Sequence, residues 1–179
     1  MACDITSGRL EPCKNSTGGN KAAFFINFQE NAFTVSNGEA TAIDAGVTEV
    51  FKYDLRADGN TLEQEAVSDF NTGTTVVTQT LNLALKKLDK DTNNELKLMA
   101  HGRPIIVVQD RNDNYQLVGH TEGADLTSGT SATGGAKADF NGYNLTFVST
   151  EACYAPFLDS ATVTALLALV SATNIDPSL

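Results

Sequence analysis

Residues 74–86 form the most constraining segment of this chain because apolar and polar side chains alternate along it. Val77, Leu81, Leu83 and Leu85 are separated by polar or small residues. This period of two predicts a long β-strand with one buried face. The predicted elements that follow it are joined by short connections.

A helix and a hairpin are predicted directly after this strand. The polar segment 89–95 supplies helix-capping residues, with Thr92 and Glu95 at the spacing of a capping box and Gly102 as the expected stop. A buried strand, a turn and a returning strand are then expected at 104–108, 111–114 and 115–118. A strand, helix and hairpin uninterrupted by a catalytic cluster indicate an assembly fold.

Shorter apolar segments extend the β pattern to both ends of the chain. With 179 residues and 41% hydrophobic residues, the chain is long enough for one domain with a real core. A short C-terminal helix is expected at 161–171, capped by Ser160. The further strands are expected at 22–28, 33–35, 47–55, 141–147 and 155–158.

Three segments lack a regular pattern. Residues 1–20 are polar and predict an N-terminal arm, so the domain itself is expected at 21–179. Residues 56–73 are acidic and predict a long loop or a hairpin tip that stands away from the core. Residues 119–139 consist largely of small residues and predict a flexible loop, or one that a partner orders.

The net charge of −10, from 22 acidic and 12 basic residues, argues against adhesive nucleic-acid binding. An acidic surface repels phosphate, and no basic cluster offsets it. The same repulsion suits a conduit through which DNA must slide. A solvated acidic surface that only maintains solubility is the simpler interpretation of the charge.

No motif indicates catalysis, a cofactor or a metal. The segment 89–95 begins like a calcium-binding loop, but Asn94 stands where that loop needs Gly, and helix capping explains the same residues better. Nucleophile-elbow and phosphate-loop patterns are absent. We therefore expect a protein that is not an enzyme and has no cofactor.

The cysteine content and the hydropathy indicate the cellular compartment in which the protein is expected. Cys3, Cys13 and Cys153 leave at least one thiol unpaired, which argues against a disulfide-built secreted scaffold. No apolar run approaches the roughly 20 residues of a membrane span, and the first residues lack a signal-peptide pattern. We expect a soluble protein made in the cytosol.

The strand-like segments 74–88, 102–110, 115–119 and 141–147 follow one another in an order that is similar to that of a known protein family. Together with the helix after the first of them, these segments resemble the tail tube (major tail) protein of tailed bacteriophages. The opening residues 1–14 resemble structural proteins of phages that infect Bacteroidetes-like hosts.

The resemblance implies a mainly β, tail-tube-like fold, a β-sandwich or half-barrel with one flanking helix. It implies rings, of six copies, whose inner strands form a continuous barrel around a lumen. Residues 74–88 and 138–150 are expected as inner strands, 56–73 as the stacking loop and 1–20 as the arm. The protein would be a structural part of the virion tail, assembled in the host cytoplasm, through which DNA passes without specific binding.

The expected partners are further copies of the chain and other tail proteins, namely the terminator, the tape measure and the sheath or baseplate. Lys86 and Lys87 fall on an expected inner strand, so we expect them to face carboxylates of a neighbour. The residues expected at contacts between subunits are Asp58, Glu63, Glu65, Asp69, Cys3, Arg9 and Cys13.

Two alternatives remain open at this stage. One is a related connector, terminator or capsid-decoration protein. The other belongs to a different class, a monomeric β module that binds a ligand such as carbohydrate or calcium.

Overall fold

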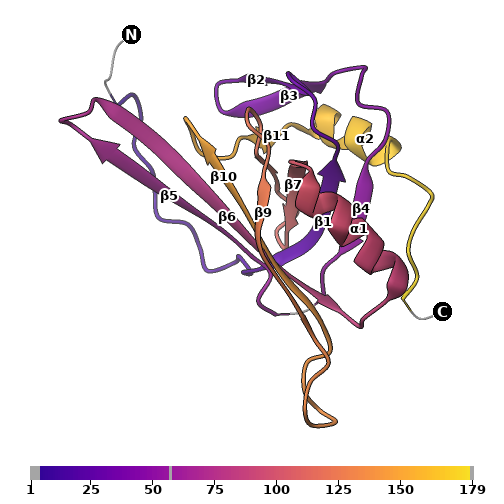
Figure 1. Cartoon of the computed structure of the whole chain (residues 1–179). Coiled ribbons are helices and arrows are strands. Elements are labelled where there is room, and N and C mark those ends of the chain that lie inside the picture. Colours follow the sequence, from indigo (N-terminus) through magenta and orange to yellow (C-terminus); the bar gives the residue numbers. More distant parts are fainter. Residues whose placement is uncertain (1–4, 57, 178–179) are drawn as a thin grey trace.

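The structure, a computed structural model, describes residues 5–56 and 58–177 and contains two β-sheets with two helices (Figure 1). The expectation of a mainly β fold with one long and one short helix is confirmed. Within the described residues, the larger sheet has seven strands in the order β2-β3-β11-β8-β7-β1-β4. Their bounds are β1 Asn20–Ile26, β2 Phe33–Ser36, β3 Glu39–Ile43, β4 Phe51–Asp54, β7 Ile105–Asp110, β8 Tyr115–Val118 and β11 Phe157–Leu158.

The smaller sheet has four strands in the order β5-β6-β10-β9, each antiparallel to its neighbour. Its two central strands contain most of the residues expected as inner strands. The bounds are β5 Thr61–Asp69, β6 Thr74–Lys86, β9 Asp125–Ala132 and β10 Gly142–Glu151. We call the two sheets the large sheet and the small sheet.

Strands β1 and β7 form the centre of the molecule because their apolar runs supply both faces of the large sheet. Phe24 and Ile26 of β1 pack in one apolar cluster, whereas Phe25 packs in a second cluster on the opposite face. Ile105 and Ile106 of β7 divide between the clusters in the same way. A continuous apolar run is what a strand buried on both faces requires.

The first cluster is completed by α2 (Ser160–Ala168), which contributes the fully buried Leu166. The cap of this helix is Asp159 rather than the expected Ser160, since the Asp159 Oδ1 accepts a 2.7 Å hydrogen bond from the Thr162 N–H. The small sheet covers the other face of the large sheet, where Leu81, Leu83 and Phe147 are buried in the second cluster.

The flanking helix α1 (Lys90–His101) packs against the second cluster through Leu96 and Met99. The capping box expected at Thr92 and Glu95 is wrong, because Asp89 is the N-cap and its carboxylate accepts from the N–H groups of Asp91 and Thr92. The helix ends at Gly102, as expected.

Tyr143 of β10 joins α1 to the small sheet. Its hydroxyl accepts a hydrogen bond from the Asp89 N–H and donates to Asn93 Oδ1, at 3.1 and 2.8 Å. The side chain is buried. The start of α1 is therefore fixed to the sheet by hydrogen bonds as well as by apolar packing.

Three expectations about local structure are wrong. Residues 119–139 are not one flexible loop, because β9 occupies Asp125–Ala132 and pairs with β10. The strand expected at 47–55 is only Phe51–Asp54. The Asp58-Gly59 dipeptide also favours a hairpin-type turn at 56–60, but no hairpin forms there, since β4 lies in the large sheet and β5 in the small one.

Candidate assembly surfaces

The outer face of the small sheet, which points away from the core, is polar. Because β6 alternates, the buried Leu81 and Leu83 leave Thr80, Asn82 and Ala84 on this outer face, where they are half-buried. The Thr146 hydroxyl of β10 donates to Asn82 Oδ1 at 2.9 Å. The register places further polar residues on the same face, namely Thr78, Asn144, Thr150, Ser128 and Thr130.

The charges on this face are mainly negative. Glu63 and Glu65 of β5 lie opposite Thr80 and Thr78, and both are exposed. Asp69 follows at the same alternation near the end of the strand. Lys86, the last residue of β6, is the basic residue at these alternating positions, and it lies at the edge of the face.

Both edges of the small sheet are open. In the part of the chain that the structure describes, β5 pairs with β6 alone and β9 pairs with β10 alone. These two strands span Thr61–Asp69 and Asp125–Ala132, so each presents a long row of backbone N–H and C=O groups. Exposed edges of this kind are templates for pairing with another chain.

The β5–β6 hairpin projects beyond the core (Figure 1), and residues 65–76 are all exposed. Its tip carries Phe70, which is 99% exposed, between strands that expose Val67 and Val76. The turn is well defined, because the Asp69 carbonyl accepts from the Gly73 N–H at 2.9 Å and Gly73 has a φ of 66°. Clustered apolar side chains on an ordered projection indicate a contact surface.

The N-terminal arm has no helix or strand over residues 5–19, and all of these residues are exposed. Its inner end is fixed to the β7–β8 turn, where Thr17 and Asn112 exchange two hydrogen bonds of 2.9 Å. Ile5 and Leu10 are 94% and 92% exposed. The arm therefore offers apolar side chains that its own domain does not bury.

The residues expected at subunit contacts fall into three groups. Glu63, Glu65 and Asp69 lie together on the outer face of β5, whereas Asp58 lies in the turn before the strand, at the far end from Asp69. The segment 61–69 is therefore an edge strand and not a loop. Arg9 and Cys13 are exposed on the arm, and Cys3 lies outside the described residues.

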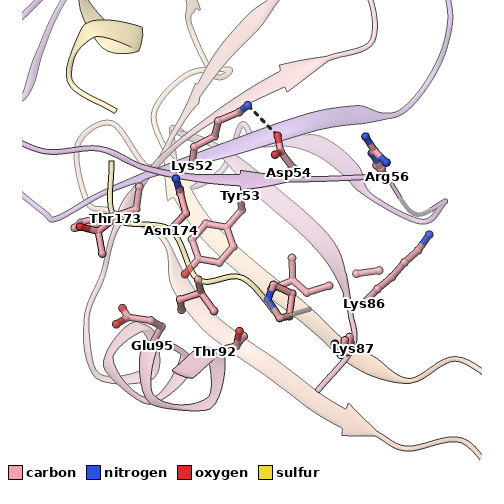
Figure 2. Close-up of a pocket in the computed structure, with 15 residues that line it drawn as sticks. Lys52, Tyr53, Asp54, Arg56, Lys86, Lys87, Thr92, Glu95, Thr173 and Asn174 are labelled. Carbon is pink, nitrogen blue, oxygen red and sulfur yellow. Dashed lines mark ion pairs between the residues drawn. The ribbon is translucent and has the colours of Figure 1, made fainter. Parts of the chain in front are cut away.

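A pocket that the sequence did not indicate lies between β4, the end of β6, α1 and the C-terminal segment 173–177. Its volume is about 470 Å³. Figure 2 shows the Tyr53 ring inside it, directed toward Thr92 and Glu95 of α1. Burial, followed by the charge of Glu95, raises the pKa of Tyr53 to about 12, so this hydroxyl stays neutral.

The rim of this pocket gathers basic residues of an otherwise acidic chain. Lys52 is paired with Asp54 at 2.9 Å, whereas Arg56, Lys86 and Lys87 form no ion pair with any residue in 5–56 or 58–177. Figure 2 shows these three side chains on the side of the pocket away from Glu95. Among residues 5–56 and 58–177, no carboxylate forms an ion pair with Lys86 or Lys87.

The total exposed surface is large for the size of the chain. The 19.0 kDa chain exposes 11474 Å². A compact monomer of this mass exposes about 8,400 Å². This excess is larger than the surface that one partner buries in a typical stable interface, and the exposed arm and the β5–β6 hairpin contribute to it.

Comparisons with protein-family models, with curated proteins and with solved structures give no match to this chain. No group of three or more His, Cys, Asp or Glu residues that could hold a metal ion occurs in the described part of the chain. None of the helices described is both long and apolar enough to cross a membrane. Cys13 and Cys153 are free and exposed.

Proposed function

We propose that this chain is a structural subunit that assembles into rings, stacked into the tail tube of a bacteriophage, and that the tube conducts DNA. One observation carries the proposal: the small sheet has two open edges and an acidic, hydroxyl-rich outer face. The resemblance of the strand order to tail tube proteins supplies the expected ring of six copies.

The directions of the strands suit closure into a ring. β5 and β9 run in opposite directions because each of the steps β5-β6, β6-β10 and β10-β9 is antiparallel. When copies are related by rotation about one axis, β9 of one copy therefore meets β5 of the next in an antiparallel sense. A closed ring would remove every open edge of the small sheet.

The outer face of the small sheet would then line the channel. Its carboxylates, Glu63 and Glu65, repel the phosphates of DNA, and its threonine and asparagine side chains keep the wall hydrated. A wall of this chemistry allows DNA to slide because its carboxylates repel the phosphates, and Lys86, the basic residue at the alternating positions of β6, lies at the edge of the face. The acidic composition of the whole chain has the same consequence.

The projecting parts would connect successive rings. The β5–β6 hairpin and the arm expose Phe70, Ile5 and Leu10, which an isolated monomer leaves in water. Burial of such side chains in neighbouring copies stabilises an assembly by roughly 25 cal/mol per Å² of apolar surface removed from water. Connector, terminator and decoration proteins would share these features, and the extent of self-assembly separates them from a tube.

A second candidate is a monomeric ligand-binding module, and the observation that favours it is the pocket at Tyr53. Its volume lies within the range of small-molecule sites. That function needs no open edges and no projecting hairpin. A chain that stays monomeric and binds a small ligand would support it.

Two neighbouring proline substitutions on the edge strand β9 test the proposal. Along such a strand, successive N–H groups point alternately toward β10 and toward the free edge. Thr130 and Ser131 are consecutive in β9 and pair with Asn144 and Tyr143. Proline has no backbone N–H. One of the two variants, Thr130→Pro and Ser131→Pro, therefore loses an N–H that points toward β10, and the other loses an N–H that points toward the open edge.

We expect the first kind of variant to unfold at a lower urea concentration. The second kind should keep the wild-type urea midpoint and yet form no rings, as measured by light scattering and electron microscopy. If the variant with the unchanged midpoint assembles like the wild type, β9 is not the ring edge and the proposal fails.

A further inference from the structure

We propose that the pocket at Tyr53 is the socket that receives the tip of the β5–β6 hairpin from a second copy of the chain. The inference rests on the proposed self-assembly and specifies which surfaces meet. It assigns a partner to two features: the exposed Phe70, and the three basic residues of the pocket rim (Arg56, Lys86 and Lys87) that have no ion-pair partner among residues 5–56 and 58–177.

The tip has the chemistry of an anchor. Phe70 is 99% exposed and stands on a turn that the Asp69 carboxylate orders by accepting from the Asn71 N–H at 2.8 Å. Asp69 places negative charge next to Phe70 in the sequence, and Glu65 follows roughly 13 Å further along β5; both are exposed. An exposed aromatic residue on a rigid turn loses little conformational entropy on binding, and aromatic residues dominate the energetics of many interfaces.

The pocket has the complementary chemistry. Phe51, Tyr53 and Leu85 contribute apolar side chains to its lining, and a volume of about 470 Å³ accommodates an aromatic ring. Arg56, Lys86 and Lys87 stand at the rim without ion-pair partners in the described chain. An aromatic tip next to the Asp69 carboxylate therefore fits both the lining and the rim.

The two surfaces lie at opposite ends of the longest strand. The tip adjoins Thr74 at the start of β6, and the pocket adjoins Lys86 at its end. These ends are about 40 Å apart at the rise of a β-strand. A tip therefore cannot reach the pocket of its own copy.

This separation determines the kind of assembly that the contact builds. A tip that enters the pocket of the next copy leaves one free pocket and one free tip at the two ends of the pair. Such a heterologous contact repeats without closing when successive copies are displaced along the tube axis, which is the property that stacking into a tube requires. The expected contact of Lys86 and Lys87 with a carboxylate of a neighbour is then supplied by Asp69, which adjoins the tip.

Site-specific photo-crosslinking tests the contact directly. The full-length chain with p-benzoylphenylalanine at position 70 is mixed with isotopically labelled wild type, irradiated, and digested for mass spectrometry. We expect cross-links between copies from position 70 to peptides within 51–56, 84–95 or 173–177. A matched control carries the photoreactive residue in place of Leu98, which is 63% exposed on α1 and does not line the pocket.

Two complementary variants test the head-to-tail polarity. Phe70→Ser removes the anchor, and Lys86→Glu with Lys87→Glu reverses the rim. Each should fail to stack alone, whereas an equimolar mixture should form assemblies of two layers and stop, because only one intact tip and one intact pocket can meet. Lys90→Glu with Lys97→Glu, on the exposed surface of α1, is the matched charge control and should stack like the wild type.

The outcomes separate this inference from the function on which it rests. Rings or tubes whose cross-links map elsewhere, or normal stacking of Phe70→Ser, would overturn the socket and leave the proposed function standing. A wild-type chain that remains monomeric at every concentration would overturn both.

Discussion

The large sheet and the small sheet are made from similar β-strand sequences, yet they bury their faces differently. The large sheet is covered on one face by α2 and on the other by the small sheet, so β1 and β7 are apolar on both sides. The small sheet buries one face and leaves a polar face and two edges open. Both faces of the large sheet are therefore covered within one chain, although its end strands β2 and β4 also have one neighbour each, whereas the small sheet leaves a whole face uncovered. In our proposal the edges of the small sheet are paired by further copies.

The comparison predicts that a phenylalanine contributes very differently to the free energy of unfolding in the two regions. Phe24→Ala in the large sheet should lower the free energy of unfolding by about 3–5 kcal/mol, because it leaves a cavity among fully buried residues. Phe70→Ala on the hairpin should change it by no more than about 0.5 kcal/mol. Urea unfolding of the monomeric fraction measures both, and a large loss from Phe70→Ala would show that the hairpin folds back on its own domain.

A smaller effect is expected where the two sheets are joined by a buried polar side chain. Gln79 of β6 is 1% exposed; its Oε1 accepts from the Gly119 N–H at 3.1 Å and its Nε2 donates to the Cys153 carbonyl at 3.3 Å. Gln79→Leu should destabilise the fold by about 1–3 kcal/mol because both backbone groups lose their partner.

The matched control for this substitution is Thr80→Val, at the next position on the outer face of the small sheet. It should change the urea midpoint very little. Equal losses from the two variants would mean that the outer face is as tightly packed as the inner one.

The smallest effect is a dependence of stability on acid pH. Hydrogen bonds, chiefly from the Thr92 N–H to Asp89 and from the Ala136 N–H to Asp139, lower the pKa of both carboxyls below the ordinary 3.8. The contribution of the two ionised carboxylates to the free energy of unfolding is therefore complete above the pKa of the unfolded state. It is lost as the pH falls through the lower pKa of the folded state. The urea midpoint should decline below about pH 4.

The isosteric double variant Asp89→Asn with Asp139→Asn keeps oxygen acceptors and removes the titration. Its midpoint should fall less steeply between pH 5 and pH 2.5 than that of the wild type. A parallel decline in the two proteins would assign the acid sensitivity to other carboxyls.

The sequence predicted the parts of the fold whose periodicity follows burial. The alternation at Val77, Leu81 and Leu83 gave β6 correctly, and the apolar run at 104–108 gave β7. The edge strand β9 escaped prediction because its Gly, Ser and Thr residues carry no apolar alternation, since backbone pairing rather than side-chain burial holds it in place.

The candidate surfaces were predictable only in part. Glu63, Glu65 and Asp69 were recognised as an acidic segment, but their alternation with half-buried Leu62 and Gln64 was too weak to indicate a strand. The pocket at Tyr53 could not be found in the sequence, because its residues come from segments that only the tertiary fold brings together.

The central claim is that this chain builds a hollow assembly whose channel is lined by the small sheet. Negative-stain electron microscopy of the purified full-length protein, with light scattering for mass across a concentration series, tests it most directly. The account predicts six-fold rings or hollow tubes whose mass rises with concentration. A monodisperse monomer at every concentration would contradict it.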